Sequence, residues 1–160
     1  MNRTSFLLFA TCAPGLESVL GRELAELGFP SEPREGGVEL RATSEGLFRI
    51  ALGSALAEGV RVRLKSFVAR DFDVLMEGVS RLPFRAYLRP GDEVRVKVVS
   101  YRSKLWHSGA IEERVGKVLV ERVGARLFDG TVEADEDAAD PTTIFVRLTG
   151  DAVQVSLDAT

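Results

Sequence analysis

The sequence predicts an α+β fold divided into two small domains. The chain has 160 residues, of which 45% are hydrophobic and 28% are charged, a balance typical of packed globular proteins. Stretches whose apolar residues recur at helical spacing alternate with short stretches in which every second residue is apolar, as in a half-buried strand. We expect the first domain to cover residues 1–70 and the second to cover residues 71–160.

The first domain is expected to begin with a buried strand and a helix. Residues 5–10 are apolar, and Pro14 and Gly15 follow them. Pro14 suits a first helical turn because it has no N–H to satisfy there, and Gly28 can adopt the left-handed backbone that ends a helix. The apolar residues between them have helical spacing: Leu16, Val19, Leu20, Leu24 and Leu27.

A hairpin, a second helix and a strand complete this domain. The hairpin covers residues 29–41 and turns at Gly36 and Gly37, and Thr43 or Ser44 caps the helix. The last strand alternates apolar with basic residues: Val60, Arg61, Val62, Arg63, Leu64 and Lys65. The order strand, helix, strand, strand, helix, strand is that of a ferredoxin-like domain, with helices on one face of an antiparallel sheet.

The second domain is predicted to contain two helices and three strands. Asp71 caps the first helix, and Ser108 or Gly109 begins the second. Between them lies a strand with one basic face: Val94, Arg95, Val96, Lys97 and Val98. An exposed edge strand protected by charge has the same pattern. Residues 142–148 and 152–157 alternate in the same way and predict a hairpin.

Positive charge is concentrated in particular segments, although the net charge is −3. Residues 59–70 contain four basic residues and no acidic one, and residues 95–126 contain eight basic and three acidic residues. Residues 127–140 contain six acidic residues and no basic one. Such segregation can attract a polyanion that the net charge does not reveal. For each basic residue alone, a solvated surface position is the simpler explanation.

The segment 100–108, Ser-Tyr-Arg-Ser-Lys-Leu-Trp-His-Ser, is the most informative part of the sequence. It combines cations, aromatic rings and hydroxyls directly before a helix whose first N–H groups can bind a phosphate. Arg102 and Lys104 can neutralise phosphates, and Ser103 and Ser108 can donate to phosphate or ribose oxygens. These residue types suit a nucleic acid.

Two further residues of this segment have alternative interpretations. Trp106 can stack on an unpaired base, or it fills a gap in the core. We expect His107 to be a hydrogen-bonding surface residue and not a catalytic base, because the sequence places no carboxylate or nucleophile beside it.

Several classes of function are excluded by what the chain lacks. A single cysteine and a single histidine allow no internal disulfide, no cysteine-rich zinc site and no chemistry that requires paired histidines. No nucleophile–base pair or cofactor loop is present, so we expect the chain by itself not to be an enzyme. No signal peptide is recognisable and no apolar run reaches about 18 residues, so we expect a cytoplasmic protein.

The opening of the sequence is Phe9-Ala10-Thr11-Cys12-Ala13-Pro14-Gly15-Leu16-Glu17, followed by Leu20, Glu23, Leu24 and Gly28. It resembles the opening of the family of THUMP-containing class I RNA methyltransferases, which act on 23S ribosomal RNA or on tRNA. Residues 102–108 resemble its Lys/Arg-Ser-x-Leu-aromatic-His segment. The likeness continues through residues 144–148 to 155–160 and so covers essentially the whole chain.

The resemblance implies that a ferredoxin-like domain is followed by a THUMP domain that positions structured RNA. The chain has neither a methyl-donor loop nor the family's Asn/Asp-Pro-Pro-aromatic motif. The resemblance implies that a methyltransferase domain that modifies guanine N2 follows downstream in the same protein. S-adenosylmethionine is expected for that domain, and no cofactor or metal for this chain.

The expected partners are RNA, either 23S rRNA or tRNA, and that methyltransferase domain, but neither DNA nor a membrane. We expect the cationic, hydroxyl and aromatic candidates to converge on one RNA-binding surface: Arg61, Arg63, Lys65, Arg95, Lys97, Arg102, Ser103, Lys104, Trp106, His107, Ser108, Arg114 and Lys117. Two alternatives are a stand-alone RNA-binding domain and a protein-interaction scaffold without a linked methyltransferase. Other THUMP proteins carry sulfur-transfer or deaminase domains instead.

Overall fold

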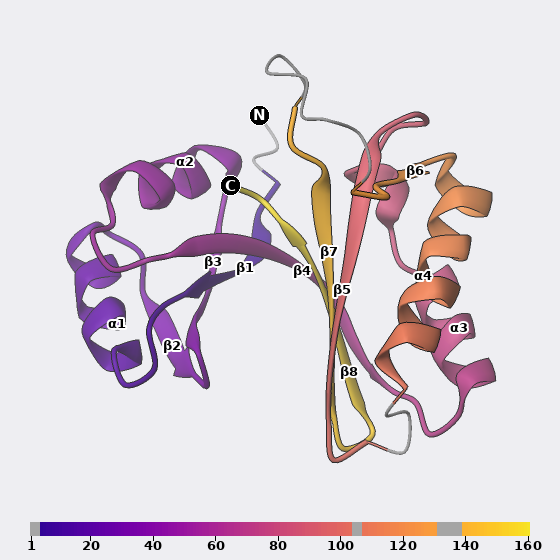
Figure 1. Ribbon diagram of the computed structural model, residues 1–160. Helices are drawn as coiled ribbons and strands as arrows, with labels where there is room; N and C mark the ends of the chain where they lie inside the picture. Colours follow the sequence, from indigo (N-terminus) through magenta and orange to yellow (C-terminus); the bar gives the residue numbers. More distant parts are fainter. Residues whose placement is uncertain (1–3, 104–106, 131–138) are drawn as a thin grey trace. The chain divides into compact units, whose positions relative to one another are not determined.

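The computed structural model describes residues 4–103, 107–130 and 139–160 (Figure 1). The chain divides into two compact units, Met1–Arg63 with Asp158–Thr160, and Leu64–Leu157. This division falls within strand β4 (Gly59–Val68), whereas the boundary predicted from the sequence follows the end of that strand. No helix in the described ranges is both long and apolar enough to cross a lipid bilayer.

The first unit has the element order predicted for a ferredoxin-like domain. Its elements are β1 (Phe6–Thr11), α1 (Glu17–Glu26), β2 (Ser31–Arg34), β3 (Gly37–Ala42), α2 (Ser44–Gly53) and the first part of β4. The strands lie in the order β2, β3, β1, β4, and each neighbouring pair is antiparallel. The core between sheet and helices contains fully buried side chains from both: Leu8, Ala10, Leu20, Leu24, Val38 and Ile50.

The ends of both helices of this unit follow from particular residues. Gly28 adopts a φ of 93° just after α1, a conformation that glycine reaches without strain. Thr43 is the N-cap of α2, and its side-chain hydroxyl accepts a hydrogen bond from the backbone N–H of Gly46 at 3.3 Å. The α2 helix ends at Gly53, where Ser54 turns into extended backbone.

The carboxylate of Glu23 in α1 connects the two helices. It accepts hydrogen bonds from the Ser54 hydroxyl and, at 2.7 Å, from the backbone N–H of Ala55. Burial raises the pKa of this carboxyl, but the hydrogen bonds from Ser54, Ala55 and Leu56 outweigh burial, so the pKa lies below its usual 4.5. The folded protein therefore favours the ionised form of Glu23.

This lowered pKa predicts a loss of stability in acid that depends on Glu23. The carboxylate stabilises the fold above about pH 4.5, and this contribution disappears as the pH falls through the lower pKa of the folded state. Glu23→Gln removes the titration. We expect the gap in unfolding free energy between wild type and variant to narrow from about pH 6 to about pH 3. Urea titrations at several pH values measure this gap, and a constant gap would contradict the prediction.

The second unit places two helices on one face of a mixed sheet (Figure 1). Its elements after β4 are α3 (Phe72–Ser80), a 3₁₀ turn (Phe84–Ala86), β5 (Glu93–Tyr101), α4 (Ser108–Val123), β6 (Arg126–Leu127), β7 (Thr142–Thr149) and β8 (Ala152–Asp158). The strand order is β4, β8, β7, β5, β6. The β5 strand is parallel to β6 and β7, and β7 is antiparallel to β8.

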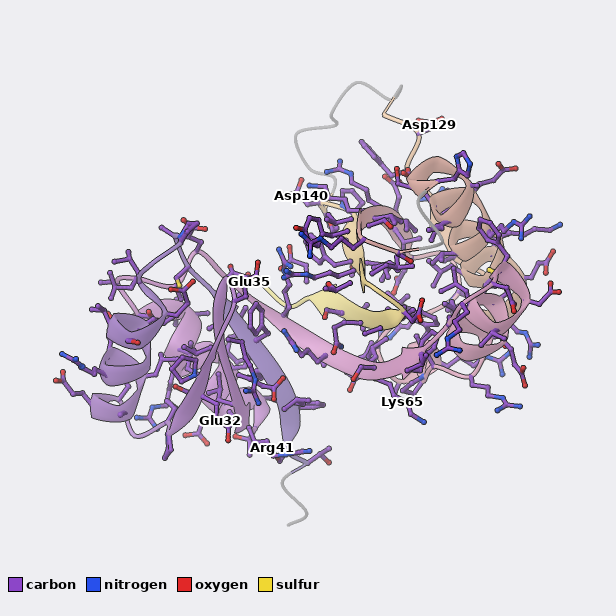
Figure 2. All side chains as sticks on the ribbon, turned by 90° about the horizontal axis from the view of Figure 1, so that it is seen from below. Glu32, Glu35, Arg41, Lys65, Asp129 and Asp140 are labelled. Atoms are coloured by element: carbon purple, nitrogen blue, oxygen red, sulfur yellow. The ribbon has the colours of Figure 1, made fainter. Side chains whose placement is uncertain are left out.

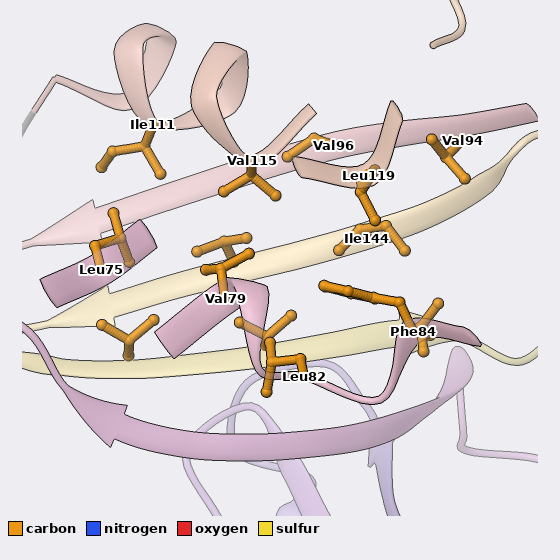
Figure 3. Packing of buried hydrophobic residues seen from close by; sticks show 14 of the residues in the cluster. Leu75, Val79, Leu82, Phe84, Val94, Val96, Ile111, Val115, Leu119 and Ile144 are labelled. Atoms are coloured by element: carbon orange, nitrogen blue, oxygen red, sulfur yellow. The ribbon is translucent and has the colours of Figure 1, made fainter. Parts of the chain in front are cut away.

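The core of this unit lies between α3, α4 and the sheet (Figure 3). The register places one set of alternating residues from each strand on the helix-covered face: Val94, Val96, Val98, Ile144, Val146, Leu148, Val153, Val155 and Leu157. From the helices come Leu75, Val79, Ile111, Val115 and Leu119, all fully buried. Asp71 caps α3 as predicted, since its Oδ1 accepts from the N–H of Val74 at 2.9 Å. Gly124 ends α4 with a φ of 77°.

Candidate nucleic-acid interface

The face of the second unit's sheet that α3 and α4 leave uncovered carries basic and aromatic side chains. In a strand, successive residues point to opposite faces, so burial of one set toward the helices directs the other set away from them. On β5 this second set is Glu93, Arg95, Lys97, Val99 and Tyr101. Val99 is 63% exposed and Tyr101 is 58% exposed, unusually high values for apolar and aromatic residues within a sheet.

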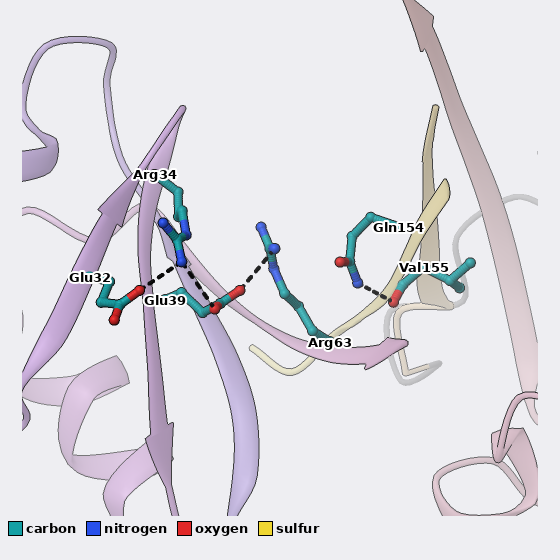
Figure 4. A network of polar contacts seen from close by, with 6 residues as sticks. All are labelled: Glu32, Arg34, Glu39, Arg63, Gln154 and Val155. Carbon is teal, nitrogen blue, oxygen red and sulfur yellow. Dashed lines mark hydrogen bonds and ion pairs between the residues drawn. The ribbon is translucent and has the colours of Figure 1, made fainter. Parts of the chain in front are cut away.

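The neighbouring strands extend this surface, which we call the open face. Lys97 lies directly beside Phe145 of β7, and Val99 lies beside Arg147. Next to Arg147 on β8 is Gln154, whose Nε2 donates to the backbone oxygen of Val155 at 3.2 Å (Figure 4). The open face contains Arg95, Lys97, Val99 and Tyr101 from β5, Thr143, Phe145, Arg147 and Thr149 from β7, and Ala152, Gln154 and Ser156 from β8, of which Thr143 and Ser156 are buried. It carries three cations. The same alternation places two carboxylates, Glu93 of β5 and Asp158 of β8, at the end of this face away from Tyr101.

Arg102 continues the open face where β5 ends. Its guanidinium lies 5.2 Å from the centroid of the Tyr101 ring, within the range of a cation–π interaction. Arg102 has a φ of 50°, the one positive φ at a non-glycine residue of the described chain. Such a conformation stores local strain and recurs at functional sites. Ser103 follows, and exposed His107 and Ser108 begin α4. Lys104 and Trp106 lie outside the described residues.

Acidic residues limit the basic surface at one margin of the sheet. The β6 strand pairs with β5 only at Glu93 and Val94, so beyond Val94 this edge of β5 has no strand partner among the described residues. A groove along the edge is lined by Arg95 and Lys97, but also by Glu112 and Asp129. Arg95 lies over the ring of Phe128 at 4.5 Å. Glu112 and Asp129 therefore offset part of the positive charge of Arg95 and Lys97 at this margin.

Other predicted cations lie away from the open face. Arg114 and Lys117 are exposed on α4, in the helix layer on the other side of the sheet. The Arg114 guanidinium stacks on the ring of Phe72 at 4.1 Å and so takes part in the contact between α4 and α3. Lys65 borders a pocket lined by α3 residues, among them Glu77. The structure thus places Arg95 and Lys97 along the open face with Arg102 at its end, whereas Lys65, Arg114 and Lys117 lie elsewhere.

Arg61 and Arg63 belong to the part of β4 in the first unit. Arg63 contacts a carboxylate and an aromatic ring of the same unit. Arg63 donates to Glu39 at 3.0 Å and lies over the Phe9 ring at 4.1 Å (Figure 4). Its side chain is only 18% exposed. Arg61, next to Phe9 in the sheet, is partly buried. We leave Arg63 out of the proposed surface because Glu39 already compensates its charge.

Phe145 and Arg147 were missed by the sequence analysis. The buried alternation of Ile144, Val146 and Leu148 implies that both face the opposite side, so the signal was present. Their position beside β5 follows from the parallel pairing of β5 with β7, which no local pattern reveals.

Comparison with known proteins bears on the first unit most directly. A family model described as the RlmL ferredoxin-like domain matches residues 7–61, from β1 into β4. These residues are thus similar to the RlmL ferredoxin-like domain. The match confirms the ferredoxin-like fold that the order of elements predicted.

Curated relatives extend the likeness beyond that domain. The ribosomal RNA large subunit methyltransferase K/L of Methylococcus capsulatus is 35% identical over 156 residues, which cover 91% of this chain and 21% of the relative. The protein of the same name from Syntrophotalea carbinolica is 32% identical and is covered to the same extent, 21%. The chain thus spans about a fifth of the length of these relatives. The predicted resemblance to RNA methyltransferases is confirmed.

A solved structure matches the chain over both units. The crystal structure of a predicted N6-adenine-specific DNA methylase from Listeria monocytogenes has a TM-score of 0.84 and is 27% identical, covering 97% of this chain and 40% of that one. This likeness, together with the element order, confirms the α+β fold class with a ferredoxin-like domain followed by an α/β domain.

A second solved structure is of interest for its ligand. The crystal structure of SMU.472 was determined in complex with SAH. It has a TM-score of 0.81 and is 28% identical, covering 100% of this chain and 42% of that one. The matched part of SMU.472 is therefore less than half of that protein.

Proposed function

We propose that the chain is the RNA-binding part of a ribosomal RNA methyltransferase and that its second unit is a THUMP domain. In this role it holds structured RNA, 23S rRNA or tRNA, for a catalytic domain in the same protein. The relatives' names and the small share of their length that the chain covers support this proposal. The chain itself supplies substrate binding, and the methyl transfer belongs to the remainder.

The proposal also covers the atom that is methylated, the methyl donor and the cellular location of the protein. The modified atom is N2 of a guanine, the methyl donor is S-adenosylmethionine, and the protein works in the cytoplasm. The SAH bound to SMU.472 supports the choice of donor, because SAH is what remains of S-adenosylmethionine after methyl transfer. Within the described residues no group of three or more His, Cys, Asp or Glu side chains is placed to hold a metal ion.

The observation that carries the proposal is the open face with Arg102 at its end. Cations on one side of a sheet attract the RNA backbone, and each phosphate they neutralise releases counterions. Contacts of this kind fix the register and orientation of an RNA without reading its sequence. An RNA held in this way leaves its target base available to a separate catalytic site, which such enzymes reach by extruding the base from its stack.

Reversing two charges tests this function. The double variant Lys97→Glu, Arg102→Glu removes two cations from one surface and adds two carboxylates. We expect its affinity for a hairpin of large-subunit rRNA to fall roughly tenfold or more at low salt. The plot of log affinity against log salt should become shallower, its negative slope losing about two units of magnitude. Filter binding at several salt concentrations measures both quantities, and tRNA serves as a second probe.

Arg81→Glu is the control, because it reverses one charge at a site away from the open face. Arg81 follows α3, its side chain is 76% exposed, and its partner is Glu77. This variant should bind RNA as the wild type does. Equal affinity of the double variant and the wild type, or no RNA binding by the wild type at low salt, would contradict the proposed function. Salt-insensitive binding to a protein instead would favour a scaffold role.

A further inference from the structure

We infer that the open face is a stacking platform for unpaired RNA nucleotides, with Tyr101 as its central ring. This inference rests on the proposed function and deepens it, because it names the part of the RNA that meets the sheet. Phosphate contacts alone make no distinction between paired and unpaired RNA, whereas an exposed aromatic ring next to cations does.

The first support is that apolar and aromatic side chains are exposed to solvent on β5, where polar side chains are usual. Val99 and Tyr101 lie in one row of β5, exposed to 63% and 58%. Exposed apolar side chains that adjoin one another and are surrounded by polar residues are a feature of interaction sites. Every second residue along a strand is about 6.6 Å from the last. An extended single strand spaces its phosphates by a similar distance, so successive nucleotides can follow Lys97, Val99 and Tyr101.

The second support is the way in which cations surround the rings. Lys97 lies directly beside Phe145, and Arg147 lies beside Val99. Arg102 sits 5.2 Å from the Tyr101 centroid. A base stacked on a ring brings its own phosphate within reach of such a cation, so that each nucleotide makes a stacking and an electrostatic contact together.

The first unit provides an internal comparison. Its sheet also has a helix-free face with an aromatic residue, Phe9, but that ring is only 5% exposed. Arg63 covers it at 4.1 Å, and Glu39 pairs with Arg63 at 3.0 Å. A second carboxylate, Glu32, pairs with Arg34 on the same sheet at 2.6 Å (Figure 4). The Phe9 ring is therefore not accessible to a base, and the arginines nearest to it and to Glu32 are paired with carboxylates.

Charge distinguishes RNA from a protein partner at the open face. The centre of a protein–protein interface is typically depleted of charged residues. The open face instead carries Arg95, Lys97 and Arg147, and the part around Val99 and Tyr101 lies at the opposite end of the strands from Glu93 and Asp158. Figure 2 draws the side chains on the ribbon and labels Asp129 and Asp140 of the acidic segment. A duplex gains nothing from an exposed ring, because its bases are already stacked in pairs. Unpaired RNA is thus the occupant that uses both the rings and the cations.

The test compares Tyr101→Ala with Tyr101→Phe in the 160-residue chain, using a short unstructured RNA and a blunt RNA duplex. Loss of the ring should weaken binding of the single strand by at least about fivefold and change duplex binding by less than about twofold. Tyr101→Phe keeps the ring and should bind as the wild type does. Phe48→Ala removes an equally exposed ring, 64% exposed on α2, and should have no effect. Fluorescence anisotropy measures all of these affinities.

The outcomes separate this inference from the proposed function. If the wild type binds structured RNA and Tyr101→Ala binds the single strand equally well, the platform is overturned and the proposed function stands. If the wild type binds neither RNA at low salt, the proposed function itself fails. If Tyr101→Ala leaves RNA affinity unchanged but weakens binding to a purified methyltransferase domain, the open face is a domain interface and the inference is wrong.

Discussion

Gly37→Ala is expected to be the most destabilising single substitution considered for this protein. Gly37 begins β3 and pairs with Thr11 of β1. A methyl group added to it would lie 2.1 Å from the carbonyl oxygen of Ala10 and 2.9 Å from Cζ of Phe9. The carbonyl belongs to backbone that the β1–β3 ladder holds in place, so it cannot move aside as a flexible side chain would. One of the two strands must therefore shift.

The expected loss of unfolding free energy for Gly37→Ala is about 3 kcal/mol or more. This is a large fraction of the stability of a small domain, about 5–15 kcal/mol. Denaturant titration followed by circular dichroism measures it. Gly109→Ala is the control, because a methyl group there meets nothing within 4 Å and replaces glycine inside α4. It should be neutral or stabilising by up to about 1 kcal/mol. Equal denaturation midpoints for the two variants would contradict this explanation.

Ile111→Ala is expected to be the second most damaging change, in the other unit. Ile111 is fully buried where α4 begins, in the cluster that contains Leu75 and Val115 (Figure 3). Truncation to alanine removes buried methyl and methylene groups and leaves a cavity between α4 and the sheet. We expect a loss of about 2–5 kcal/mol in unfolding free energy.

Val120→Ala on the same helix is the matched control for Ile111→Ala. Val120 is 43% exposed, and its truncation should change stability by no more than about 0.5 kcal/mol. The open face lies on the other side of the sheet from this core. Ile111→Ala, measured at a temperature at which it remains folded, should therefore retain the RNA affinity of the wild type. Strong loss of affinity in the folded variant would show that the binding surface extends into the helix layer.

The helices and strands could be predicted from the sequence because alternation, helical spacing and capping residues each depend on neighbours within one element. Alternation along residues 94–98 separated a buried from a basic face, and the structure shows Val94 and Val96 buried with Lys97 exposed on the other face. Helix ends followed from caps and glycines, as at Asp71 and Gly124. These features require no knowledge of which strand lies beside which.

The candidate site could be predicted only in part, because a site depends on pairing between distant segments. Phe145 joins Lys97 through the parallel β5–β7 ladder, and Arg63 meets Glu39 on a different strand. Arg114 has the spacing of an outer helical position, yet it stacks on Phe72 of another helix. Alternation shows which face a residue occupies, but only the register shows its neighbours across the sheet.

The most direct test of the central claim is an NMR titration of the ¹⁵N-labelled chain with a short unstructured RNA. Binding of RNA to the open face predicts that the amide shift changes concentrate on β5, β7 and Arg102, with the largest near Tyr101, and that the α1 and α2 amides stay unchanged. Changes confined to the first unit or to the outer surface of α4, or none at low salt, would contradict it.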